Sequence, residues 1–222
     1  MNTSSPHIRS YRLRPRHGAL SPLRAARYAR LAARWTLPAD GEVLDLHAVF
    51  GPAEIVLDIG FGGGEALIEL AAARPDEAIM CVEVHTRGVA NVLEAIDDNG
   101  WIQIRVVEAD VLELLPRVPL QSLASVRMFF PDPWPKYKHR NRRLARPDVV
   151  MQIVDRLRVG GTWHVATDIE EYAQQVIGAA AGDDRLSGGV VPRPSWRPST
   201  RYEQRGLAAG RTAVDLIFER LH

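Results

Sequence analysis

The chain has 222 residues, of which 46% are hydrophobic and 25% charged, and its formal net charge at pH 7 is +1. This length and composition fit one globular α/β domain with short extensions. No run of about 18 apolar residues occurs, which excludes a membrane-spanning helix. The single cysteine, Cys81, excludes an intrachain disulfide, and with no secretory signal we expect a reducing, cytoplasmic location.

Positive charge is concentrated in three segments. Residues 1–39 hold eight arginines and no acid, residues 136–146 hold six basic residues and no acid, and residues 193–211 hold five basic residues against Glu203. The rest of the chain holds nine basic and 26 acidic residues. Cationic segments that converge in space predict a polyanionic partner, and we expect nucleic acid. The arginine- and serine-rich beginning of the chain is also typical of an organelle transit peptide, which is the alternative for that segment.

From residue 55 the sequence alternates between short apolar runs and stretches with helical periodicity. We expect strands at Ile55–Ile59, Ala78–Val84, Ile102–Glu108, Ser125–Phe130, Thr162–Thr167 and Ala213–Arg220. Helices are predicted between them at Glu65–Ala73, Arg87–Asp98, Val111–Leu115, Pro147–Leu157 and Glu170–Ala180. This alternation predicts an α/β three-layer sandwich, in which helices cover both faces of a mostly parallel sheet and ligands bind at the carboxyl ends of the strands.

The connection between the first strand and its helix is the glycine-rich loop Asp58-Ile59-Gly60-Phe61-Gly62-Gly63-Gly64-Glu65. Gly60, Gly62 and Gly64 let the backbone turn sharply and approach a ligand closely. The dinucleotide fingerprint needs a further glycine where Glu65 stands, and an acid at the start of a helix would repel a pyrophosphate. The loop therefore favours a nucleoside ligand without phosphates and argues against the alternative of a nicotinamide-dependent oxidoreductase.

Acids stand at the ends of the following strands. Glu83 ends the second strand, 23 residues after Gly60, where a carboxylate can accept from both ribose hydroxyls. Asp110 ends the third strand, where it can accept from an adenine amino group, and Asp58 can meet a positively charged amino group. An adenosine that carries a cationic amino-acid tail is S-adenosylmethionine, which is the cofactor that we expect.

The most informative segment is Val126–Lys136, in which an apolar run ends at Asp132 between two prolines. The prolines fix the backbone, so the segment cannot continue as a helix. Trp134 and Lys136 follow at once. A stiff strand end with an acid, an indole and an ammonium suits a pocket for a flat polar base. Trp134 has two equal interpretations, stacking on a base or covering the cofactor pocket.

Five segments together resemble the bacterial tRNA (guanine-N7-)-methyltransferase family, namely Asp58–Gly64, Glu83–His85, Phe129–Trp134, Ala166–Asp168 and Thr200–Gly206. The resemblance covers nearly the whole chain, and the Phe-Phe-Pro-Asp-Pro-Trp and Thr-Arg-Tyr-Glu blocks are its most specific parts. It implies a Rossmann-like class I methyltransferase fold with a mostly parallel seven-stranded sheet and an antiparallel last strand. It also favours an RNA-binding arm over a transit peptide. We therefore expect a basic, partly disordered N-terminal arm over residues 1–36 and an S-adenosylmethionine-dependent methyltransferase domain over residues 37–222.

The same resemblance implies transfer of a methyl group to N7 of a guanine in tRNA, which we expect to be guanosine 46 of the variable loop. It assigns the cofactor to Asp58, Gly60, Gly62, Glu83, Asp110 and Asp132. It assigns the substrate to Lys136, Asp168, Thr200, Arg201, Tyr202 and Glu203, and RNA to Lys138, His139, Arg140, Asn141, Arg142 and Arg143. We expect tRNA as the partner, no metal, no membrane, and a monomer or homodimer.

Methyl transfer to guanine N7 does not require a general base. Guanine N7 carries a lone pair and no proton, so a fixed carboxylate helps by orienting guanine and by stabilising the positive charge that develops on it. Asp132 is the predicted catalytic residue, with Asp168 as a second acceptor. Two alternatives remain. One is a methyltransferase that acts on an exocyclic adenine nitrogen, although such enzymes carry Asp/Asn-Pro-Pro-aromatic where this chain has Asp132-Pro133-Trp134-Pro135. The other is a tRNA-binding chaperone that keeps a vestigial cofactor fold.

Overall fold

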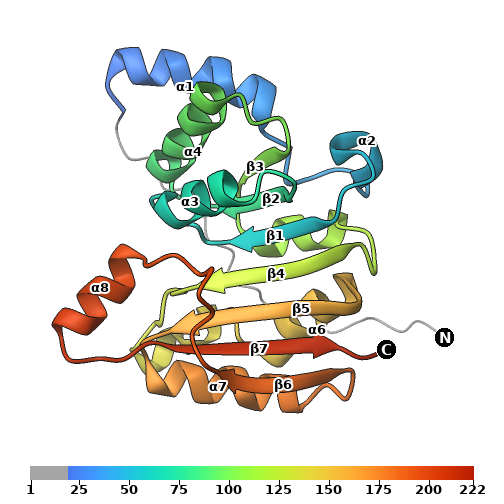
Figure 1. Cartoon of the computed structure of the whole chain (residues 1–222), viewed down its shortest axis with the longest axis vertical. Helices are drawn as coiled ribbons and strands as arrows, with labels where there is room; N and C mark the ends of the chain where they lie inside the picture. The colour runs from blue at the N-terminus through green and yellow to red at the C-terminus, as the bar shows by residue number, and fades with distance from the viewer. Residues whose placement is uncertain (1–19) are drawn as a thin grey trace.

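A seven-stranded sheet forms the centre of the protein in the computed structural model, which describes residues 20–222 (Figure 1). The strands are β1 (Ile55–Ile59), β2 (Ala78–Glu83), β3 (Ile104–Glu108), β4 (Leu123–Phe129), β5 (Leu157–Thr167), β6 (Leu186–Val191) and β7 (Val214–Arg220). Their order across the sheet is β3-β2-β1-β4-β5-β7-β6, and β7 runs antiparallel to both of its neighbours. The predicted fold class is therefore confirmed.

Helices cover both faces of the sheet. They are α1 (Pro22–Trp35), α2 (Leu46–Phe50), α3 (Glu65–Ala73), α4 (Thr86–Asn99), α5 (Val111–Leu114), α6 (Pro147–Arg156), α7 (Glu170–Ala181) and α8 (Arg201–Ala208), with 3-10 helices η1 (Leu115–Arg117) and η2 (Tyr137–Arg142). The helices α1, α3 and α4 lie on one face, and α6 and α7 lie on the other (Figure 1). Alternate residues of a strand point to opposite faces, so Met80 and Val82 join the core under α6 and α7, whereas Ile79 and Cys81 join the core under α3 and α4.

The described part of the predicted arm belongs to the folded domain. Ser21 caps α1 through its side chain, and Pro22 occupies the first turn, where proline is tolerated. Leu31 and Trp35 are one turn apart and are buried in the core beside α4. Helix α1, which falls within the expected arm, thus packs against α4 and β3, and the domain boundary after residue 36 stays a prediction. Residues 1–19, which hold the rest of the arm, lie outside the described residues.

The arginines of α1 form ion pairs with acids of α4. Arg24 pairs with Glu94 of α4 at 2.8 Å, Arg27 pairs with Asp98, and Arg30 pairs with Asp97 at 3.2 Å. These acids on α4 offset the arginines that made this segment look like a free cationic arm. RNA binding by the arm stays a prediction, and within residues 20–36 it has little unpaired charge to rest on.

Two observations concern membrane-spanning helices and metal sites. Within residues 20–222 no helix has both the length and the apolar character needed to cross a bilayer. The same part of the chain contains no group of three or more His, Cys, Asp or Glu side chains placed to hold a metal ion.

Candidate active site

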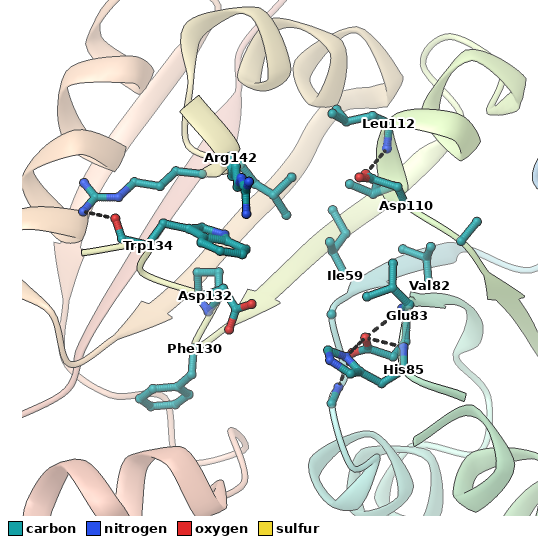
Figure 2. A pocket seen from close by; sticks show the side chains of 18 of the residues that line it. Ile59, Val82, Glu83, His85, Asp110, Leu112, Phe130, Asp132, Trp134 and Arg142 are labelled. Carbon is teal, nitrogen blue, oxygen red and sulfur yellow. Dashed lines mark hydrogen bonds and ion pairs between the residues drawn. The ribbon is translucent and has the colours of Figure 1, made fainter. Parts of the chain in front are cut away.

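A cavity opens at the carboxyl ends of the parallel strands (Figure 2). One side of it is formed by the glycine loop and the ends of β2 and β3. The other side is formed by the segment that follows β4 and by Arg142, Arg143, Leu144 and Arg146, and Tyr202 of α8 completes the lining. Figure 2 shows the two sides facing one another. Five of the six predicted cofactor residues share this cavity, namely Gly60, Gly62, Glu83, Asp110 and Asp132.

Glu83 is held rigidly at the cavity wall. Its Oε2 accepts from the Gly62 backbone N–H at 2.7 Å, and its Oε1 accepts from the N–H groups of Val84 at 2.7 Å and His85 at 3.0 Å. The ring Nδ1 of His85 lies 2.7 Å from the same Oε1. A carboxylate offers about four acceptor sites, so Oε2 retains acceptor capacity for a ligand hydroxyl. This arrangement fits the predicted role of Glu83, and it makes His85 a local hydrogen-bonding residue.

The glycine loop reaches Glu83 because of two glycines, one of which the sequence analysis did not single out. Gly62 has a φ of +58°, a left-handed conformation that favours glycine. Gly88 in the first turn of α4 packs against the loop so closely that a Cβ there would overlap the Gly62 carbonyl oxygen. The start of α4 therefore packs directly against the loop. The sequence signal for this contact is a glycine within an otherwise helical pattern.

Asp110 begins α5 at the far end of the cavity. Its Oδ1 accepts from the Leu112 backbone N–H at 2.9 Å, so the carboxylate caps the helix. The side chain is buried and lines the cavity, and Figure 2 shows it on the same side as Glu83. Glu83 and Asp110 are therefore placed along one wall, as two acceptors of a single elongated ligand would be.

Asp58 is the predicted cofactor residue that the structure does not bring to this wall. It is buried, and the cavity lining in residues 20–222 begins with Ile59. The parallel register places Asp58 beside Arg127 of β4, which lies beside His164 of β5. Burial raises the pKa of Asp58 to about 6, an effect that Arg127 opposes and Glu83 reinforces. Its predicted contact with an amino group is therefore untested by the geometry.

Asp132 and Trp134 stand on the opposite wall. Figure 2 shows the Asp132 carboxylate facing the cavity and the Trp134 ring beside it. The guanidinium of Arg142 lies 4.8 Å from the centre of the Trp134 ring, and His139 meets the ring edge with centroids 5.7 Å apart. An aromatic ring backed by a cation is a surface on which a flat base can stack. Both predicted interpretations of Trp134 are compatible with this position.

The predicted substrate residues separate into two groups. Tyr202 enters the cavity lining, and its neighbour Arg201 pairs with Glu65 of the glycine loop at 2.9 Å. Thr200 caps α8 by accepting from the Glu203 N–H at 3.0 Å. Asp168 accepts from Nε of Arg211 at 2.7 Å and does not line the cavity described for residues 20–222. Lys136 is exposed and likewise stands outside that lining.

Glu203 occupies a different place from the one predicted. It is buried and pairs with Arg197 at 2.7 Å, and Arg197 pairs in turn with Asp215 of β7 at 2.7 Å. His164 of β5 bonds the same aspartate at 2.7 Å. Both oxygens of Glu203 accept from Arg197, so this carboxylate anchors α8 to the sheet, and its contact with substrate stays a prediction. Asp215 of β7 is likewise buried.

One of the residues predicted to contact RNA lies inside the protein. Arg143 is buried, with 1% of its side-chain surface exposed. The other predicted contacts, Lys138, His139, Arg140, Asn141 and Arg142, lie in η2. Within η2, Arg140 pairs with Glu171 at 2.9 Å, and Arg142 faces the cavity.

Comparison with known proteins relates the chain to methyltransferases. Residues 52–216 match the model of a family described as putative methyltransferase. A tRNA (guanine-N(7)-)-methyltransferase of Streptomyces avermitilis is 41% identical over 221 residues, covering 96% of this chain and 76% of that protein. A protein of the same name from Nitrosospira multiformis is 40% identical, covering 97% of this chain and 96% of that one.

A solved structure supports the fold. Geranyl diphosphate C-methyltransferase from Streptomyces coelicolor, in complex with Mg²⁺, geranyl diphosphate and S-adenosyl-L-homocysteine, matches with a TM-score of 0.55. The match covers 90% of this chain and 80% of that one at 12% identity, so it concerns the fold alone. The sheet order and this match give a class I methyltransferase fold. On the strength of the two close relatives and the family model, the chain belongs to the tRNA (guanine-N(7)-)-methyltransferase family.

Proposed function

We propose that this protein transfers a methyl group from S-adenosylmethionine to N7 of a guanine in tRNA, at guanosine 46 of the variable loop. The observation that carries the proposal is one cavity in which Glu83 and Asp110 form one wall and Asp132 and Trp134 form the other. The first wall offers acceptors to an adenosine, and the second offers an acceptor and a stacking ring to a second flat base. The names of the relatives support tRNA and guanine N7 as the target.

The glycine loop fits a nucleoside that carries no phosphates. The carboxylate of Glu65, at the start of α3, lies against Gly63 and pairs with Arg201. The position at a helix start that attracts a pyrophosphate is therefore taken by an acid of the chain itself. Glu83 would hold the ribose hydroxyls and Asp110 the adenine end. When bound there, S-adenosylmethionine supplies a methyl group attached to a positively charged sulfonium.

The residues of the second wall act on the acceptor base. N7 of guanine has a free lone pair, so no side chain has to remove a proton before the methyl carbon bonds to it. Asp132 would accept hydrogen bonds from the N1–H and amino groups of guanine and so fix the base in position. The same carboxylate would stabilise the positive charge that the purine gains. Trp134 would hold the plane of the base.

The direct test uses unmodified tRNA and labelled S-adenosylmethionine. Incorporated label, followed by aniline-induced cleavage at position 46, supports the proposal, and a transcript with adenosine at that position serves as the control. Cleavage at another guanine would move the site within the tRNA. Label on an adenine amino group would favour the exocyclic-nitrogen alternative. Binding of tRNA without incorporation would favour the chaperone.

A further inference from the structure

The side chain of Arg143 is enclosed by the protein, although the exposed cations Lys138 and Arg140 stand shortly before it in the sequence. Its Nε donates to the Pro133 carbonyl oxygen at 2.6 Å, and its Nη2 reaches the Trp134 carbonyl oxygen at 3.4 Å. Its Nη1 donates to Glu171 Oε1 at 2.9 Å and to Gln175 Oε1 at 2.8 Å. Both acceptor side chains lie on α7. One guanidinium therefore connects the loop after β4 to α7.

The loop after β4 has an unusual backbone. Phe130 has a φ of +51° and Trp134 a φ of +41°, a left-handed conformation that is unfavourable for residues with a Cβ. Pro133 and Pro135 restrict φ on both sides of Trp134, so its neighbours cannot rotate to relieve the strain. Asp132 lies between the two strained residues. The direction of its carboxylate therefore depends on whatever holds this loop in place.

We infer that Arg143 is a positioning residue that holds Asp132 and Trp134 in the cavity, and that it does not contact RNA. The two carbonyls that it bonds belong to the loop, and its charge is offset within the protein by Glu171. A buried guanidinium needs such a partner, because an unpaired buried charge is strongly unfavourable. Both Arg142 and Arg143 line the cavity. The guanidinium of Arg142 lies over the Trp134 ring, whereas the guanidinium of Arg143 is bonded to the loop carbonyl of Pro133 and to α7.

This inference rests on the proposed methyl transfer. A positioning role and an RNA contact predict different effects of Arg143 on kcat and on the affinity for tRNA. Loosening the loop misplaces Asp132 and lowers kcat at saturating tRNA, since a displacement of about 1 Å in an active site costs about 100-fold in rate. The affinity for tRNA depends on exposed cations and is unaffected. An RNA contact at Arg143 would instead set tRNA affinity and its dependence on salt.

The variant Arg143→Lys tests the inference with the charge retained. A lysine ammonium cannot bond two carbonyls and two α7 side chains at once, because it lacks the planar fork of arginine. We expect kcat to fall about 10- to 100-fold while the tRNA Kd stays within about twofold of wild type. The comparator Lys138→Met removes an exposed cation of η2, and we expect it to weaken tRNA binding and reduce the salt slope by about one. A wild-type kcat in Arg143→Lys would overturn the inference, as would a salt slope of Arg143→Met reduced like that of Lys138→Met.

A second variant keeps the test valid if Arg143→Lys does not fold. Glu171→Gln keeps the shape of a half-exposed side chain and weakens its hold on Arg143. The positioning role predicts a lower kcat with tRNA affinity unchanged or higher, because a negative charge has been removed. An unchanged kcat in Glu171→Gln would count against the role.

Fluorescence gives a readout that does not need turnover. Acrylamide quenching of Trp134 is obtained as the difference between each protein and its Trp134→Phe form. We expect Trp134 to become more accessible in Arg143→Lys and in Glu171→Gln, and equal quenching in all proteins would contradict the inference. If the wild type itself transfers no methyl group to tRNA, the proposed function fails, while the quenching result still decides whether Arg143 holds the loop.

Discussion

Replacing Arg197 by methionine is expected to destabilise the protein in a pH-dependent way. Arg197 is fully buried between Glu203 and Asp215, with an N···O distance of 2.7 Å to each. Methionine fills much of the volume and removes the cation that the two buried carboxylates share. Glu203 keeps Arg193 at 3.3 Å and Asp215 keeps His164 at 2.7 Å. Removing one partner of a buried ion pair costs about 3–5 kcal/mol. That loss is a large part of the free energy of unfolding of a typical domain, which is about 5–15 kcal/mol.

The pKa values of the two carboxylates set the direction of the pH dependence. Burial alone would raise the pKa of Glu203 and of Asp215, but hydrogen bonds from Arg197, joined by His164 at Asp215, lower both below their usual values. In the wild type this contribution to stability is present at neutral pH and is lost as the pH falls below about 4. Without Arg197 burial dominates, so the folded pKa values rise above the unfolded ones. The variant should therefore lose most stability at neutral pH and least in acid.

Urea unfolding at about pH 7 and about pH 5 measures this difference. Arg205→Met, an exposed change on the same helix α8, is the matched control and should alter the free energy of unfolding by less than about 0.5 kcal/mol. Adding Glu203→Gln and Asp215→Asn to Arg197→Met should restore part of the loss, because neutral amides tolerate burial better than carboxylates. A loss in Arg197→Met below about 1 kcal/mol, or an equal loss at both pH values, would refute the reasoning.

Three further changes test other parts of the structure. Asp132→Ala should abolish turnover with little change in cofactor affinity by calorimetry, and near wild-type methylation would remove this carboxylate from the mechanism. Removing residues 1–19 keeps α1 and should weaken tRNA binding in salt titrations, whereas removing residues 1–36 should also cost about 3–5 kcal/mol by thermal melting, because the buried Trp35 leaves the core. Equal melting of the two truncated proteins would contradict this. Burial raises the pKa of Asp58 to about 6, so Asp58→Asn should stabilise the protein by about 1–3 kcal/mol at neutral pH. This gain in the free energy of unfolding should shrink as the pH falls toward about 4. A gain that does not change with pH would contradict the prediction.

Elements whose signals are local could be predicted from the sequence. The strand Ile55–Ile59 and the helix Glu65–Ala73 match the structure at both ends, because an apolar run, a glycine turn and a proline stop stand next to one another in the chain. The strand β6 was missed because Gly188 and Gly189 remove its strand signal, and pairing with β7 alone makes it a strand. Helices α1 and α8 were missed because arginines interrupt their apolar residues, and contacts with distant segments hold both helices.

The fold class and three acids of the cavity could be predicted from the order of the strands. Parallel strands bring their carboxyl ends to one edge, so Glu83, Asp110 and Asp132 meet there once the strands are recognised. Which charges face solvent depends on the tertiary structure. A cation such as Arg143 is exposed or buried according to what lies opposite it, and its partners on α7 come from 28 and 32 residues further along the chain. The composition gives only the number of charged residues. The role of each charged side chain depends on its burial and on its ion-pair partners, which the fold sets.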